Sequence, residues 1–227
     1  MPDFTGLDYA AITWLLVGWI GYTAFADFSR FRARSLSAAM DRYRRRWMVE
    51  MMRREMRMVD TSLVATLQQG IGFFATTAIL VVGGLVAAMG AAEPGVTALS
   101  DLPFAVRTSK IAWEIKVLLL LAIFIYCFFK FAWAFRLSNY FAILIGAAPV
   151  ATGETPDEAA HVERAVRLGG IAAHHANGGL RAYYFGLAAL GWFLHPALFA
   201  LATTWVVLVL YRREFHSRAL RALNARS

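Results

Sequence analysis

Four long apolar stretches, separated by arginine-rich segments, constrain what this chain can fold into. They cover residues 8–28, 64–92, 111–136 and 183–211. Each is as long as the roughly 20 residues that a helix needs to cross the hydrocarbon core of a bilayer. Backbone amides in lipid must be paired within their own segment, so we expect these stretches to be helices. The sequence therefore predicts an all-α, polytopic membrane protein with four transmembrane helices.

The composition fits a single membrane domain over residues 1–227 and argues against a soluble nucleic-acid-binding protein. Charged residues make up only 17% of the chain, whereas soluble proteins average about 25%. The net charge of +8 comes from basic residues that flank the apolar stretches, as the positive-inside rule predicts for cytoplasmic segments. We expect these residues to face anionic lipid headgroups and expect no nucleic acid partner.

The N-terminal segment predicts a retained first helix that starts outside the cytoplasm. Asp3 and Asp8 precede this span, Arg30 follows it, and no small-residue cleavage site ends the apolar run. The pattern is not that of a secretory signal peptide. The charge difference places the segment after the first span in the cytoplasm.

An amphipathic cytoplasmic helix is predicted over about residues 36–60. At helical spacing, methionines and Trp47 gather on one side and arginines on the other. Such a helix lies at the membrane interface or packs on a neighbour, and a solvated linker helix is the simpler alternative. The residues predicted to contact anionic lipid or a partner protein are Arg44, Arg45, Arg46, Trp47, Met51, Arg53, Arg54 and Arg57.

The second span is rich in glycine and alanine, which let helices approach closely in lipid. We expect it to pack against another copy, which predicts a symmetric homo-oligomer. Lys130 and Arg136, near the end of the third span, either snorkel to lipid phosphates or form a basic constriction for an anion. The predicted polar lining of a pore is Gln68, Gln69, Thr76, Thr77, Lys130 and Arg136.

The third span is expected to continue as an extended helix to Pro149, followed by a loop, over residues 137–182. As one helix from 111 to 148 it would be about 57 Å long. Thr155 is expected to cap a short helix in this region, and Pro196 to kink the fourth span. Four crossings leave the chain end outside, yet five arginines follow Tyr211. Residues 137–150 as a short fifth crossing would remove this conflict, although four spans are favoured because 14 residues are few for a span.

A polar motif precedes the fourth span, in the sequence AAHHANGGLRAYYFG. It is predicted to shape the entry of the chain into the membrane, and its candidate residues are His174, His175, Asn177, Arg181, Tyr183 and Tyr184. The two adjacent histidines share no helix face and match no zinc signature. His195, beside Pro196, is expected to bond a carbonyl freed by the kink, and haem ligation is the disfavoured alternative.

No short catalytic signature is present, and Cys127 is the only cysteine. The chain lacks a GxSxG elbow, a phosphate-binding loop and an HExxH motif. A single cysteine excludes an intrachain disulfide and a cysteine metal cluster. We expect a protein that is not an enzyme and binds no cofactor or metal.

Four stretches carry a resemblance to a known family. They are RRRWM, VATLQQGIGFFATTAIL, FRLSNYFAILIGAAP and GLRAYYFGLAALGWFLHPALFALATTWVVLVLYRREF. The chain resembles, over nearly its whole length, the domain of unknown function 599 family of bacterial and plant membrane proteins. The resemblance implies a multi-span helical protein and carries no activity and no catalytic residues.

Two functions from different classes follow. The first is a homo-oligomeric channel- or transporter-like assembly in the bacterial inner (plasma) membrane. The alternative is a non-catalytic structural or regulatory subunit that docks on anionic lipid, or on a membrane partner of unknown identity, through its Arg/Met-rich helix. An enzyme or haem protein centred on His174, His175 and His195 is the least favoured hypothesis.

Overall fold

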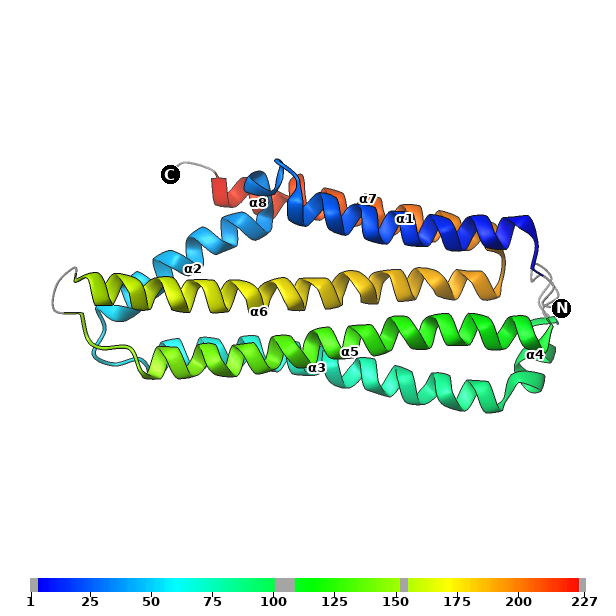
Figure 1. Cartoon of the computed structure of the whole chain (residues 1–227), viewed down its shortest axis with the longest axis horizontal. Coiled ribbons are helices and arrows are strands. Elements are labelled where there is room, and N and C mark those ends of the chain that lie inside the picture. The colour runs from blue at the N-terminus through cyan, green and yellow to red at the C-terminus, as the bar shows by residue number, and fades with distance from the viewer. Residues whose placement is uncertain (1–3, 101–108, 152–154, 225–227) are drawn as a thin grey trace.

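The structure is a computed structural model that describes residues 4–100, 109–151 and 155–224. Over these residues the chain forms helices and no strand. Five long helices lie along one direction in a flat layer, in the order α3, α5 and α6, with α1 and α7 together on the far side of α6 (Figure 1). Their bounds are α1 Gly6–Phe28, α3 Met58–Gly90, α5 Lys110–Gly146, α6 Pro156–Ala189 and α7 Pro196–Phe215.

Shorter elements join them: η1 Arg32–Arg34 and α2 Leu36–Met52 between α1 and α3, α4 Ala92–Ser100 after α3, η2 Leu190–Phe193 before α7, and α8 Arg218–Asn224. We call the end of the bundle that carries α2 and its arginines the basic end, and the end at which α1 begins the neutral end (Figure 1). Residues 101–108, between α4 and α5, lie outside the described residues.

Four helices are long and apolar enough to cross a membrane, which confirms the predicted fold class. They are α1, α3, α5 and the segment Pro196–Asn224 that contains α7. The mean hydropathy of the best window reaches 2.2 in α3 and 2.3 in α5. The chain is therefore an integral membrane protein by length and composition of its helices.

The predicted fourth span, residues 183–211, is wrong as a single helix, because the chain reverses direction within it. Residues up to Ala189 complete α6, η2 makes the turn, and Pro196 is the first residue of α7. His195 caps α7, since its Nδ1 accepts a hydrogen bond from the amide of Ala197 at 3.0 Å. A proline at the first helical position costs no hydrogen bond, so Pro196 starts a helix instead of kinking one.

The predicted loop before that span is also wrong, because its residues form the first part of α6. The predicted cap at Thr155 is confirmed: its hydroxyl accepts from the amide of Glu158, whose carboxylate accepts from the Thr155 amide. The helix that it starts is 34 residues long. Histidine, asparagine and arginine lower its hydropathy, and α5, α2, α1 and α7 shield it on several sides.

An odd number of long helices brings the chain to its end at the basic end. Among the described residues, α1, α3, α5, α6 and α7 run along the bundle, so α7 ends beside α2 (Figure 1). The C-terminal α8 contacts α2, and Arg42 donates to the side chain of Asn224 at 3.3 Å. The basic tail thus lies with the other arginines, and residues 137–146 belong to the predicted extended α5 rather than to a separate crossing.

The predicted basic helix over residues 36–60 is shorter, and it packs on its neighbours. α2 ends at Met52, and α3 begins at Met58. Met48, Met51 and Met52 are buried in a cluster with residues of α3, α5 and α6. This cluster forms a second core at the basic end, apart from the larger core between the long helices.

Glycines allow α5 and α6 to lie close together in the larger core. A Cβ at Gly179 would come within 2.8 Å of the Phe131 ring, and one at Gly186 within 2.9 Å of Phe124. Phe124, Phe131 and Phe185 are almost fully buried there. Close approach at small residues is a usual source of stability between helices in lipid.

Candidate functional site

A stripe of small and polar residues runs along the exposed side of α3. It consists of residues seven apart: Ser62, Gln69, Thr76, Gly83 and Gly90. All five are exposed, and a Cβ at Gly83 or Gly90 would meet nothing within 4 Å. Spacing by seven keeps residues on nearly one side of a helix, drifting by about 20° per step. We call this set the α3 stripe.

The α3 stripe stands out because α3 as a whole is strongly apolar, with a mean hydropathy of 2.2 in its best window. Only 6% of the span window of this helix is buried, and its contacts are chiefly with α5. Within the described part of the chain, neither Gln69 nor Thr76 has a hydrogen-bond partner for its side chain. Polar groups that face lipid are unfavourable, and small residues favour helix association. The stripe is therefore the best candidate for contact with another helix or with a polar passage.

The structure brings only two residues of the predicted pore lining onto this stripe, Gln69 and Thr76. Gln68 donates to the side chain of Asn139 on α5 at 2.8 Å, and Thr77 donates to the carbonyl of Phe73 at 2.8 Å. Their polar groups are thus used within the protomer. The prediction placed both on the same surface as Gln69 because neighbouring residues in sequence were not separated by helix face.

The predicted basic residues of the lining lie away from the stripe as well. Lys130 packs against α6, with its Cε 3.5 Å from the position that a Cβ at Gly178 would occupy. Arg136 is exposed on α5 and donates from Nε to the hydroxyl of Tyr140 at 2.8 Å. Neither residue lies on α3: Lys130 faces α6, and Arg136 is on α5, one turn from the Asn139 that binds Gln68.

Among the described residues, the interior of one protomer holds two polar clusters with mainly apolar side chains between them. At the neutral end, Trp192 donates to Asp8 at 2.7 Å, and the ammonium of Lys116 lies 5.4 Å from the Trp192 ring. Nearer the basic end, Arg181 binds Asp27. Buried apolar side chains separate these two polar clusters: Leu15 on α1, Leu120, Ile123 and Phe124 on α5, and Ala182 and Phe185 on α6.

The predicted membrane-entry motif lies in the middle of α6 and forms no turn. Arg181 donates from Nη1 to both carboxylate oxygens of Asp27 at 2.9 Å, and its guanidinium lies 5.6 Å from the Tyr22 ring. Arg181 therefore pairs with a carboxylate of α1 and does not shape an entry of the chain into the membrane. His174 Nδ1 lies 4.0 Å from Asp27.

Other residues of the motif face different neighbours. Tyr184 accepts a hydrogen bond from Arg213 at 2.9 Å, and Tyr183 packs edge-on against Phe124. Nδ1 of His175 is buried without a described partner, and no hydrogen bond of Asn177 is described. Among the described residues, no three His, Cys, Asp or Glu side chains are close enough together to hold a metal ion.

Most residues predicted to contact lipid or a partner are used inside the chain. Met51 is fully buried. Asp60, also fully buried, accepts from Trp47 Nε1 and from Arg54, both at 2.7 Å. Arg57 donates to carbonyls at the end of α5, including that of Pro149 at 2.7 Å. These contacts attach α2 and the start of α3 to α5.

The remaining predicted contact residues pair locally or face solvent. Arg44 pairs with Asp41 and lies across Gly169, 2.9 Å from the position of a Cβ there. Arg53 pairs with Glu50 at 3.4 Å, and Arg46 is exposed.

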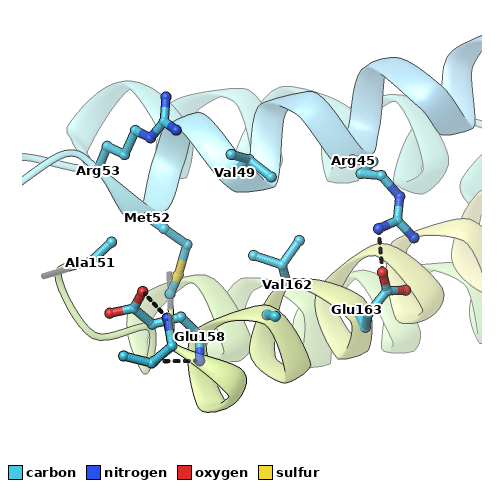
Figure 2. Close-up of a pocket in the computed structure, with 10 residues that line it drawn as sticks. Arg45, Val49, Met52, Arg53, Ala151, Glu158, Val162 and Glu163 are labelled. Atoms are coloured by element: carbon cyan, nitrogen blue, oxygen red, sulfur yellow. Dashed lines mark hydrogen bonds and ion pairs between the residues drawn. The ribbon is translucent and has the colours of Figure 1, made fainter. Parts of the chain in front are cut away.

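A groove separates α2 from the first turns of α6 (Figure 2). We call it the α2–α6 groove; its volume is about 480 Å³. Val49, Met52 and Val162 give it an apolar floor, and Arg53 and the ion pair of Arg45 with Glu163 lie at its sides. The hydrogen bond from Arg45 lowers the pKa of the Glu163 carboxyl below its ordinary value. The groove thus combines an apolar floor with charged edges.

Comparison with known proteins shows to which family the chain belongs. The model of the family described as protein of unknown function, DUF599, matches residues 10–219. The chain belongs to this family. No curated protein and no solved structure matches the chain. The family description carries no activity, so the function of this DUF599 protein must be argued from its own residues.

Sequence reasoning missed four acidic residues that organise this DUF599 protein: Asp27, Asp41, Asp60 and Glu163. Asp27 alone gave a signal, because it is an acidic residue inside the first apolar stretch. A charge in a span predicts a partner within the bundle, and Arg181 is that partner. The other three lie in polar segments, where a carboxylate is unremarkable.

Proposed function

We propose that this protein forms a symmetric homo-oligomer in the bacterial inner membrane and acts as a channel- or transporter-like assembly. The proposal rests on the α3 stripe, in which exposed polar and small residues recur every seven positions on an apolar helix. Copies arranged about an axis would remove the stripe from lipid. Neither this function nor the alternative below includes catalysis.

A passage between copies fits better than one within a protomer. The described core of the protomer between its two polar clusters is mainly apolar, with the fully buried Thr203 beside Gly18 as a polar exception, so a solute would have few hydrogen-bonding partners there. The α3 stripe offers Ser62, Gln69 and Thr76 as polar groups and glycines as the narrowest side chains. Arg136 lies near the level of Gln69, because Phe135 contacts Gly72 and Asn139 binds Gln68. It would therefore stand near the basic mouth of such a passage.

Cysteine cross-linking in lipid tests the proposed assembly. The single native cysteine is buried, so a Cys127→Ala background is suitable for introduced cysteines. Thr76→Cys should give a disulfide-linked dimer under mild oxidation, whereas Leu67→Cys, which is exposed on the opposite side of α3, should not. Solute flux in vesicles should fall when Gly83→Leu narrows the passage. A native mass of one protomer, or equal cross-linking at both positions, would overturn the proposal.

A second candidate function is favoured by the α2–α6 groove. A structural or regulatory subunit would bind a partner protein there, because the floor is apolar and the edges are charged (Figure 2). Val49 is 37% exposed in the groove, so Val49→Asp should abolish co-purification of a partner and leave flux unchanged. Arg46→Glu, on the same helix but outside the groove lining, is the matched control. Loss of flux in Val49→Asp with no partner in the wild type would contradict this candidate.

A further inference from the structure

A polar cavity lies where α1 ends and α2 begins, against the middle of α6. Its volume is about 290 Å³. Charged side chains from five elements line it: Asp27, Arg32, Asp41, Arg44, Arg181 and Glu214. It is separate from both the α3 stripe and the α2–α6 groove. We call it the junction cavity.

The charges that line the junction cavity balance. Three guanidinium groups and three carboxylates give a formal charge of zero when His174, which also lines the cavity, is counted as neutral. A site for a simple anion would carry an excess of positive charge. A balanced set of donors and acceptors instead matches a ligand that carries both signs.

Contacts within the chain hold most of the groups that line the cavity in place and leave others available to bind a ligand. Asp27 is bound by Arg181, whose side chain is only 9% exposed, and Asp41 is paired with Arg44. Glu214 accepts the amide of Ser37 through Oε1 at 3.0 Å. In the described part of the chain, the guanidinium of Arg32 and the amide of Asn177 have no partner, which leaves two donors facing the cavity.

Acceptors remain as well. The contacts described for Glu214 and Asp41 use one oxygen of each carboxylate. The second oxygen of each can accept from an ammonium group, because a carboxylate has about four lone-pair sites. Donors for a phosphate and acceptors for an ammonium therefore line one cavity.

The junction cavity also lies at the level expected for lipid headgroups. α1 has 23 residues and is about 34 Å long, which is close to the roughly 30 Å of hydrocarbon thickness. The cavity lies at the C-terminal end of this helix, beside Ala26 and Asp27. Met40, which is 45% exposed, and Leu36 provide apolar lining there.

We propose that the junction cavity binds a zwitterion made of a phosphate diester and a primary ammonium, the chemistry of an ethanolamine phospholipid headgroup. Arg32 and Asn177 bind the phosphate, and the free oxygens of Asp41 and Glu214 bind the ammonium. The buried ion pair of Arg181 with Asp27 forms the part of the cavity wall that lies between the phosphate-binding and the ammonium-binding residues. This site is independent of the proposed assembly through α3.

Native mass spectrometry of the full chain from nanodiscs of defined lipid tests the proposal. Protein from nanodiscs that hold phosphatidylethanolamine in phosphatidylcholine should retain one ethanolamine lipid. Arg32→Gln should reduce that retained fraction about tenfold, because it removes a charged hydrogen-bond donor. Arg34→Gln is the matched control, since Arg34 is exposed two residues away and does not line the cavity.

Further measurements distinguish a lipid from a free ligand and test the groups that bind each of the two ligand charges. Soluble glycerophosphoethanolamine that protects wild-type protein but not Arg32→Gln against thermal unfolding, without lipid retention, would support the chemistry with a free zwitterion as its source. Asp41→Asn should weaken retention of ethanolamine lipid. Equal retention of phosphatidylglycerol or phosphatidylcholine, or retention unchanged in Arg32→Gln, would overturn the proposal.

Discussion

At the scale of single residues, the contact between Asp27 and Arg181 determines how a charged helix is kept inside a membrane protein. The two residues are 154 positions apart in the chain, and both are largely buried. The sequence indicated each charge, but it could not pair them, because several arginines and carboxylates were available. Pairing follows from the antiparallel packing of α1 and α6, which only the fold determines.

Removing one member of this pair should lower the free energy of unfolding more than removing both. Asp27→Ala leaves the Arg181 guanidinium without its counter-ion, and breaking a buried pair typically costs about 3–5 kcal/mol. The double variant Asp27→Ala with Arg181→Met should recover most of that loss, because no uncompensated charge remains. Unfolding measured in the same detergent for wild type, both single variants and the double variant checks this. Additive losses would contradict a buried, coupled pair.

The exposed pair of Arg45 with Glu163 should show the opposite behaviour, a small and pH-dependent effect. Its hydrogen bond lowers the folded-state pKa of Glu163 below its ordinary value. The pair therefore contributes stability above the unfolded-state pKa and loses it as pH falls through the lowered folded-state pKa. The difference in free energy of unfolding between wild type and Glu163→Gln should be constant near neutral pH and vanish in acid. A difference that grows as pH falls would contradict this assignment.

At the scale of secondary-structure elements, amphipathic patterns and capping residues predicted helix positions correctly. A continuous apolar stretch, in contrast, led to the wrong boundaries for the fourth span. The methionine face of α2 and the Thr155 cap of α6 both follow from local chemistry. The stretch from Tyr183 to Tyr211 reads as one helix because the turn LGWFLH between α6 and α7 is itself apolar. A reversal packed against the bundle needs no polar turn residues, so sequence hydropathy could not locate it.

Two adjacent glycines of α6 should respond differently to the same substitution. Gly179→Ala places a Cβ 2.8 Å from the Phe131 ring, which forces α5 and α6 apart at a cost of about 1–3 kcal/mol. Gly178→Ala meets only the flexible side chain of Lys130, at 3.5 Å, and should be tolerated. Thermal unfolding of both variants in nanodiscs checks this. Equal stability of the two would contradict the close approach of α5 and α6 at Gly179.

At the scale of the whole molecule, α6 decides at which end of the bundle the basic α8 lies. Four crossings would return the basic tail to the side on which α1 begins, against the positive-inside rule. With α6 as a polar helix shielded by α5, α1 and α7, the layer has five long helices among its described residues, and the tail meets α2. The basic tail conflicted with the predicted number of crossings because α6 is too polar to be recognised as a span from its hydropathy.

Labelling of introduced cysteines in intact and permeabilised cells should place these segments. In a Cys127→Ala background, Leu194→Cys in the turn before α7 should react with an impermeant reagent from outside, as should Glu93→Cys on α4. Arg46→Cys on α2 and Arg221→Cys on α8 should react only after permeabilisation, because both lie at the basic end. Reaction of Arg221→Cys from outside would restore the four-crossing topology. Reaction of Leu194→Cys only from inside would show that the turn after α6 does not reach the outer surface, and that α6 and α7 do not cross as antiparallel neighbours.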